Sequence, residues 1–95
     1  MRIDSTEQMI AGYMSTFNEM IAIIEKKSND YGVRCWQELG AKGLFADINR
    51  KYWRLRNIIW DGNEPMVSDE NIRDTVLDLA NHCIQLAIML KENEP

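Results

Sequence analysis

The last helical segment of this chain carries a stripe of oxygen-bearing side chains. On a helix that turns by about 100° per residue, five of them fall within about 80° of one another: Glu70, Asp74, Asp78, Asn81 and Gln85. Carboxylate and amide oxygens are the ligands that a hard cation such as Mg²⁺ prefers in proteins. A plain solvated helix face has the same composition, so the stripe has two interpretations, a metal site and an ordinary surface.

A cationic edge is expected on the preceding helical segment. Asp47, Lys51 and Arg54 follow one another at spacings of four and three residues, which puts them on one side of a helix. One interpretation is an exposed ion-pair ladder within the helix, a common and weakly stabilising feature of protein surfaces. The other is that Lys51 and Arg54 bind phosphate oxygens while Asp47 joins a metal site.

Two tryptophans mark a second side of the same segment. Trp53 and Trp60 are seven residues apart with Arg56 between them, opposite the apolar stripe of the helix. Aromatic rings flanked by arginine are typical of contact surfaces. We expect a homo-oligomer interface here. Stacking of nucleobases on the rings is the sharper alternative, and packing of the rings beneath a short helix is the third.

Apolar periodicity predicts four helical segments and no strand, that is, an all-α bundle of three long helices plus one short helix. The first helix begins at an N-cap within residues 4–6 and runs to about Lys27. Turn-forming residues and Gly32, a glycine able to take a left-handed conformation, then end it. A short turn of helix follows over Cys35–Leu39.

Two further long helices complete the expected bundle. Gly43 closes the linker before the third segment, and the predicted apolar stripe of that segment is Leu44, Ile48, Tyr52, Leu55, Ile58 and Ile59. A loop around residues 61–65 follows, and Ser68 or Asp69 caps the final helix. The predicted apolar side of that helix is Ile72, Val76, Leu79, Cys83, Leu86 and Leu90.

Length and charge limit the function. Ninety-five residues make one domain, 1–95, with a core thin enough that completion by oligomerisation is expected. The net charge of −4 argues against binding to duplex nucleic acid, which requires a cationic footprint. Cys35 and Cys83 lie in apolar contexts without metal-ligand spacing, so we expect reduced, packed thiols. Neither a signal peptide nor a membrane span is visible, so a cytoplasmic protein is expected.

Several short motifs resemble the nucleotide-modification-associated domain family, formerly a domain of unknown function that is common in bacteria and phages. They extend from about Lys26 to Leu90 and comprise Asp30-Tyr31-Gly32, Trp36, Lys51 with Arg54, Asp74-Thr75 and Asp78-Leu79-Ala80-Asn81. That family looks like a relative of the MazG-like all-α nucleoside triphosphate pyrophosphohydrolases, in which paired acidic residues on two helices bind Mg²⁺.

The resemblance implies metal ligands at the stripe. In the pyrophosphohydrolases an asparagine commonly follows the last acidic ligand by seven residues, and Asp74 and Asn81 have that separation. Asp74 therefore resembles the terminal metal ligand, and the other expected ligands are Asp78, Glu70 and Asp47. The acidic pair of the partner helix is missing, because residues 47–51 offer one carboxylate and two cations. One Mg²⁺ ion is easier to reconcile with these residues than two.

Three functions follow as expectations, and the catalytic residues stay unassigned. The first is binding of a nucleotide or nucleotide-derived small molecule by a cationic and an acidic helix, as in a phage or bacterial nucleotide-sequestering protein. The expected ligand-binding residues are Lys27, Asp30, Tyr31, Trp36, Lys51, Arg54 and Asn81. The alternative is a Mg²⁺-dependent nucleoside triphosphate pyrophosphohydrolase, in which the metal activates a water molecule against a phosphate. A purely structural interaction module that uses the tryptophan face is a third possibility.

Overall fold

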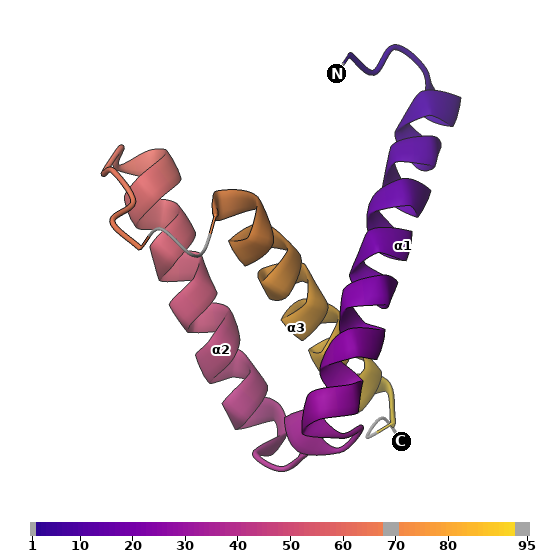
Figure 1. Ribbon diagram of the computed structural model, residues 1–95, viewed down its shortest axis with the longest axis vertical. Coiled ribbons are helices and arrows are strands. Elements are labelled where there is room, and N and C mark those ends of the chain that lie inside the picture. The colour runs from indigo at the N-terminus through magenta and orange to yellow at the C-terminus, as the bar shows by residue number, and fades with distance from the viewer. Residues whose placement is uncertain (1, 68–70, 93–95) are drawn as a thin grey trace. The chain divides into compact units, whose positions relative to one another are not determined.

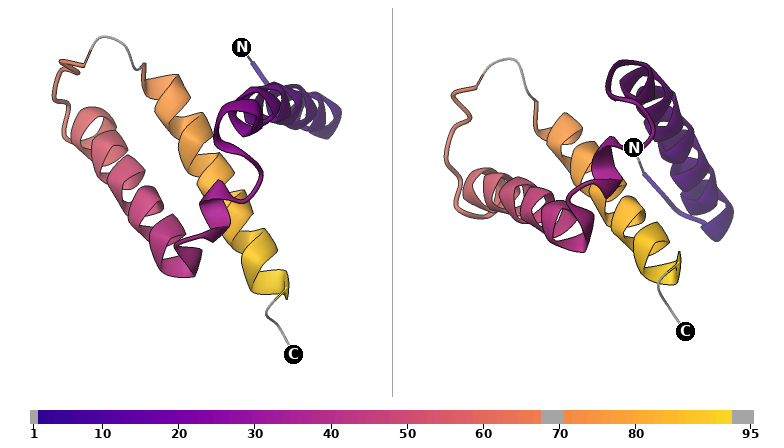
Figure 2. Two further views of the ribbon diagram at one scale, coloured as in Figure 1. Left: turned by 60° about the horizontal axis from the view of Figure 1, so that its bottom comes forward. Right: turned by 90° about the horizontal axis from the view of Figure 1, so that it is seen from below.

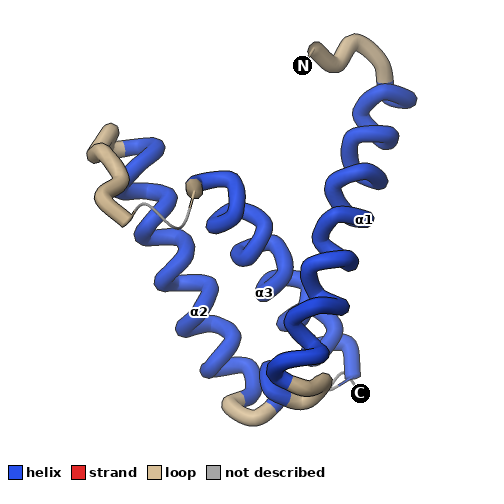
Figure 3. Tube along the Cα trace, in the orientation of Figure 1, coloured by secondary structure: helices blue, strands red, loops and turns tan. Residues whose placement is uncertain are grey.

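The protein is all-α, as the sequence predicts. A computed structural model describes residues 2–67 and 71–92; the chain is 80% helical, with three long helices and no strand among these residues (Figure 3). Within the same ranges, no helix is long and apolar enough to cross a membrane. The chain divides into two compact units, Met1–Val33 and Arg34–Pro95, which we describe one at a time. The single domain expected over 1–95 stays a prediction.

The first unit consists of helix α1 (Thr6–Tyr31) and the residues that cap it. The Ser5 hydroxyl accepts a hydrogen bond from the Gln8 backbone N–H at 3.1 Å, and the Gln8 side chain accepts one from the Asp4 N–H at 2.7 Å. The Ser5 bond confirms the predicted N-cap, and the Gln8 side chain reaches one residue farther back than in a capping box, to the residue before the N-cap. Five large apolar side chains of α1, spaced three or four residues apart on one side of the helix, are exposed, namely Ile10, Tyr13, Met14, Phe17 and Ile21.

The C-terminus of α1 lies four residues beyond the predicted end. Ser28 was expected to start a turn, but its hydroxyl donates to the carbonyl oxygen of Glu25 at 2.9 Å, a bond compatible with a continuing helix. The helix ends at Gly32, whose φ of +79° lies in the left-handed region that glycine adopts without strain. The choice of Gly32 as the terminating glycine was therefore correct.

The second unit is a helical hairpin preceded by one short helix. Its elements are η1 (Cys35–Gln37), α2 (Gly40–Leu55), the π-helical turn η2 (Arg56–Trp60) that continues α2, and α3 (Ile72–Glu92). Helices α2 and α3 pack side by side and run in opposite directions, as Figures 1 and 2 show. This antiparallel pair brings the cationic segment and the acidic segment of the sequence together.

Helix α2 begins earlier than predicted, because Gly40, with φ of +66°, is its first residue. The prediction that Gly43 closes a linker is wrong; Gly43 lies in the first turn of α2. A Cβ atom added there would overlap the Leu39 Cβ, closer than any real pair of such atoms comes. Gly43 is thus required by the close approach of the residue that precedes the helix.

Replacing Gly43 with alanine is expected to destabilise the protein. The clash with the Leu39 Cβ forces the first turn of α2 to shift, at a cost of about 1–2 kcal/mol in the free energy of unfolding measured by urea denaturation. Gly12→Ala is the matched control, since nothing lies within 4 Å of a Cβ at that position of α1. Alanine there should be neutral or stabilising by up to about 1 kcal/mol. Equal stabilities of the two variants would contradict the steric argument.

Helices α2 and α3 face each other with residues that differ in part from the predicted apolar stripes. In several turns, the buried residue is the sequence neighbour of the predicted one. In α2, Tyr52 and Ile59 are exposed, whereas Lys51 is half-buried. In α3, residues 72, 79 and 86 are half-buried as predicted. The exposed residues of the predicted stripe are Val76, Cys83 and Leu90; the residues that are buried or half-buried in their place are Thr75, His82 and Met89.

Polar contacts between the helices explain this rotation. Lys51 and Arg54 of α2 both contact side chains of α3, so the facing surfaces have to include polar positions. The rotation also moves Cys83 to the surface. Cys83 and Cys35 are free thiols, as predicted, but both are exposed rather than packed.

The first residues of α3 are positioned by Asn71. Its Oδ1 atom accepts a hydrogen bond from the Asp74 backbone N–H at 2.8 Å, and its carbonyl oxygen accepts one from the Thr75 N–H at 3.3 Å. Asn71 therefore acts as the N-cap of α3. The predicted caps, Ser68 and Asp69, lie outside the described residues.

Candidate functional site

An ion pair links the cationic helix to the acidic helix. The Lys51 Nζ atom lies 3.3 Å from Asp78 Oδ2, and their side chains are only 18% and 27% exposed. The ordinary alternative for Lys51 was an exposed ladder within α2. The structure instead turns Lys51 to the neighbouring helix, where partial burial weakens screening by water and strengthens its interaction with any nearby anion.

A second contact lies one turn later in α2 and, because the helices are antiparallel, one turn earlier in α3. The Arg54 Nε–H donates to Thr75 Oγ1 at 3.2 Å, and Thr75 Oγ1 in turn lies 3.4 Å from the Asn71 carbonyl oxygen, to which its hydroxyl donates. Thr75 is fully buried, at 0% exposure, and Arg54 is half-buried. We call Lys51, Arg54, Thr75 and Asp78 the polar seam of the hairpin.

Asp47 stands apart from the seam contacts. Its carboxylate pairs with Arg50 on the next turn of α2, and this ion pair is largely exposed on the arginine side. Asp47 thus has an ion-pair partner on its own helix, but this partner is Arg50, which the predicted ladder of Asp47, Lys51 and Arg54 did not include. Successive contacts at Arg54–Thr75 and Lys51–Asp78 give the antiparallel register, and the next step along it brings Asp47 level with His82.

The carboxylates proposed as Mg²⁺ ligands have different surroundings. Asp78 faces Lys51, Asp47 faces Arg50, and Asp74 is exposed at the start of α3. Within residues 2–67 and 71–92, no group of three or more His, Cys, Asp or Glu side chains is placed to hold a metal ion. Glu70 lies outside those ranges, so magnesium binding stays a prediction.

The polar stripe continues along α3 as a partly buried surface. Asn81 and Gln85 are half-buried, and the Gln85 Oε1 lies 3.2 Å from His82 Nδ1, within hydrogen-bonding distance. The stripe is therefore not a simple solvated face from Asp78 onward; of its members within residues 71–92, only Asp74 has the exposure that the surface interpretation requires.

The other predicted ligand-binding residues lie elsewhere in the chain. Lys27, Asp30 and Tyr31 occupy the last turns of α1, in the first unit, and Asp30 and Tyr31 are exposed. Trp36 is half-buried in η1, at the start of the second unit. The structure places Lys51, Arg54 and Asp78 together, whereas the roles of these four residues stay predictions.

A cluster of aromatic residues and arginine covers the end of α2 and the π turn. Arg56 places its guanidinium carbon 5.2 Å from the centroid of the Trp53 ring, and its Nη1 donates to the Tyr52 hydroxyl at 3.3 Å. The Tyr52 and Trp53 rings meet edge to face, with centroids 5.6 Å apart. Trp60 is 82% exposed. The interpretation that the rings pack beneath a short helix is thus wrong for Trp60.

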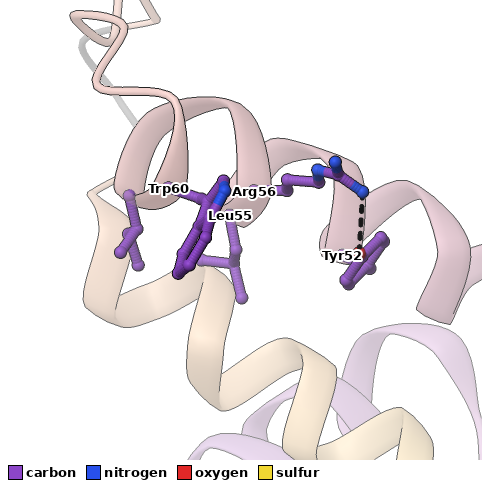
Figure 4. A pocket seen from close by; sticks show the side chains of 5 residues that line it. Tyr52, Leu55, Arg56 and Trp60 are labelled. Atoms are coloured by element: carbon purple, nitrogen blue, oxygen red, sulfur yellow. Dashed lines mark hydrogen bonds between the residues drawn. The ribbon is translucent and has the colours of Figure 1, made fainter.

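A shallow pocket of about 480 Å³ lies beside this cluster (Figure 4). Its lining residues are Tyr52, Leu55, Arg56, Ile59 and Trp60. Trp53 is not among them, although the sequence put Trp53 and Trp60 on one line. The π turn accounts for the difference, because each of its residues advances less than 100° around the helix axis and so changes the register of Trp60.

Comparisons with protein-family models, with curated proteins and with solved structures found no match to this chain. The resemblance to the nucleotide-modification-associated domain family therefore depends on its short motifs alone.

The sequence placed Thr75 only in a motif of the resembled family and Tyr52 only in an apolar stripe, so neither was predicted to belong to the site or the aromatic surface. A signal for the true inner face was nevertheless present, because Leu44, Lys51 and Ile58 recur every seven residues, as do positions 72, 79 and 86. Seven-residue spacing is typical of antiparallel helix pairs with coiled-coil packing. The pattern was missed because Lys51 is polar, whereas the predicted stripes were chosen from apolar residues.

Proposed function

We propose that this chain is a cytoplasmic nucleotide-binding protein that holds a nucleotide or nucleotide-derived small molecule at the polar seam, with Lys51 and Arg54 contacting the phosphates. The observation that carries the proposal is the orientation of these two cations. They lie one turn apart and half-buried toward α3, where they contact Asp78 and Thr75, rather than in solvent.

The charges of the seam favour a phosphate as ligand. Lys51 lies 3.3 Å from the carboxylate of Asp78, and Arg54 donates to the neutral hydroxyl of Thr75 at 3.2 Å. A doubly charged phosphate gains more from two adjacent cations than a single carboxylate does, and its oxygens form charge-assisted hydrogen bonds with both lysine and arginine.

The acidic and amide groups of α3 supply a second type of contact. Asp78 and Asn81 lie three residues apart on one side of α3, and both are half-buried. Their oxygens can accept hydrogen bonds from sugar hydroxyls or base amino groups, and the Asn81 amide can also donate. A ligand with both phosphate and hydrogen-bonding groups, as in a nucleotide, matches this combination better than inorganic phosphate alone.

Binding without hydrolysis is the form of the proposal that the contacts favour. Two of the candidate metal ligands, Asp47 and Asp78, have a cation beside them, which competes with Mg²⁺ for the carboxylate. The pyrophosphohydrolase alternative requires Glu70, Asp74 and Asp78 to act together with metal. Recovery of the ligand, intact or hydrolysed, distinguishes binding from hydrolysis.

The test begins with mass spectrometry of the small molecules that co-purify with the protein, followed by calorimetric titration with a panel of nucleoside mono-, di- and triphosphates. Lys51→Ala and Arg54→Ala are each expected to weaken nucleotide binding by about 1.5–3 kcal/mol, roughly 10- to 150-fold in Kd, because each removes one charge-assisted contact. Arg50→Ala is the matched control, since Arg50 is an exposed arginine of the same helix that pairs with Asp47. Equal effects of all three variants, or no binding to any nucleotide, would refute the proposal.

Hydrolysis is followed in the same samples. The binding function predicts that the ligand is recovered intact after prolonged incubation with Mg²⁺. Pyrophosphate release that requires Mg²⁺ and is lost in Asp74→Asn would establish the enzymatic alternative instead.

A further inference from the structure

The surface of Tyr52, Trp53, Arg56, Ile59 and Trp60, which we call the aromatic–arginine surface, has the composition of a protein contact. Aromatic residues and arginine are enriched at the centres of protein interfaces. Contacts with Tyr52 and Trp53 hold the Arg56 side chain in place, which lowers the entropy lost when it binds a partner. The surface lies on the opposite side of α2 from the polar seam residues Lys51 and Arg54 in sequence register, so a partner here does not need the nucleotide site.

The form of the pocket argues against a small-molecule occupant. All five lining residues come from one continuous helical stretch, residues 52–60, as Figure 4 shows. Sites for small molecules usually enclose most of the ligand surface between several elements. A notch along a single helix instead fits the side chains of another protein.

The charges around the surface identify a second copy of this chain as the partner. Asp61 follows the π turn, and its backbone N–H donates to the Arg56 carbonyl oxygen at 3.0 Å, so it lies one π turn beyond Arg56. Neither Arg56 nor Asp61 makes an ion pair within the part of the chain that the structure describes. The surface therefore presents a positive and a negative group on either side of Ile59 and Trp60.

A two-fold axis through such a surface makes it complementary to itself. In an antiparallel contact centred near Ile59, Arg56 of each copy lies opposite Asp61 of the other, and Ile59 and Trp60 fill the centre. Nucleic acid is disfavoured as the occupant, because Asp61, Glu64 and the net charge of −4 repel phosphates. We propose that the aromatic–arginine surface forms a two-fold homodimer interface with reciprocal Arg56–Asp61 ion pairs.

The test is a charge exchange followed by sedimentation equilibrium of the full chain. Arg56→Asp and Asp61→Arg each place like charges opposite one another at both ends of the interface, so each raises the dimer Kd by at least about tenfold. The double variant, Arg56→Asp with Asp61→Arg, restores opposite charges and returns Kd to within about threefold of wild type. Trp60→Ser, which removes the central aromatic contact, also shifts the protein toward the monomer.

Mixing the two single variants gives a result that only this contact predicts. At a concentration where each variant alone is mostly monomeric, a 1:1 mixture places the two acidic side chains of one variant opposite the two basic side chains of the other, so the mass of the dimer reappears. Arg34→Asp, at an exposed arginine of the same unit, is the control for a general charge effect and should leave Kd unchanged. Circular dichroism of each variant establishes that it is folded.

Three outcomes would overturn the proposal: a wild-type protein that is monomeric up to about 1 mM, single variants that dimerise like wild type, or a mixture of them that stays monomeric. Because Lys51 and Arg54 are unchanged throughout, these outcomes are independent of nucleotide binding.

Discussion

Replacing Leu44 with alanine is expected to lower the free energy of unfolding by about 2–4 kcal/mol. Leu44 is 2% exposed, the lowest value for an apolar side chain among the described residues. Its removal loses the transfer free energy of three carbon atoms and leaves a cavity that the rigid helix pair fills only in part. A domain of this size has a total stability of about 5–10 kcal/mol, so the loss is a large fraction of it.

Urea denaturation followed by circular dichroism measures this effect, and Phe45→Ala supplies the control. Phe45 is the next residue of α2 and carries a larger side chain, but it is exposed. Its truncation should change stability by no more than about 0.5 kcal/mol. If Phe45→Ala proved as damaging as Leu44→Ala, the orientation of α2 described above would be wrong.

The helices themselves were predictable from the sequence because their local signals are strong. The Ser5 cap and Gly32 gave the start and the terminating glycine of α1. The boundaries that were missed depend on contacts that no local rule records. Gly43 is an example. Glycine is required there because the Leu39 Cβ leaves no room for a side chain, and not because the backbone turns at that residue.

The buried faces were less predictable, because hydropathy alone ranks Val76 above Thr75 and Tyr52 above Lys51. In the structure the polar member of each pair is the more buried one. A threonine or lysine can occupy such a position when its polar atom has a partner on the facing helix. That partner belongs to a residue more than 20 positions away along the chain, so the pattern becomes visible only once the two helices are aligned.

The candidate site was likewise predictable in part. The sequence identified Lys51, Arg54 and Asp78 as residues able to do chemistry, and the structure brings them together. It did not identify Thr75, which is the fully buried member of the seam. The π turn that separates Trp60 from Trp53 was also unforeseen, because an i to i+5 hydrogen bond leaves no simple pattern in the residue types.

Replacing Thr75 with valine tests the seam and is expected to lower the free energy of unfolding by about 1.5–3 kcal/mol. Valine has nearly the same shape, so the loss reports the hydroxyl group and not a cavity. The Arg54 Nε–H then loses the Thr75 acceptor in a half-buried place, and bonds to charged groups contribute about this much. Urea denaturation measures the change.

A double-mutant cycle with Arg54→Met identifies the source of that loss. When both partners are apolar, neither leaves an unsatisfied polar group behind, so the double variant should be more stable than the sum of the single changes predicts, by about 1 kcal/mol or more. Additive effects would show that the Arg54–Thr75 hydrogen bond contributes nothing to stability. Thr75→Val also keeps both cations of the seam. Nucleotide affinity should therefore fall less in this variant than in Arg54→Ala, even if the protein is less stable, because the phosphate contact depends on the charge of Arg54 and not on its threonine partner.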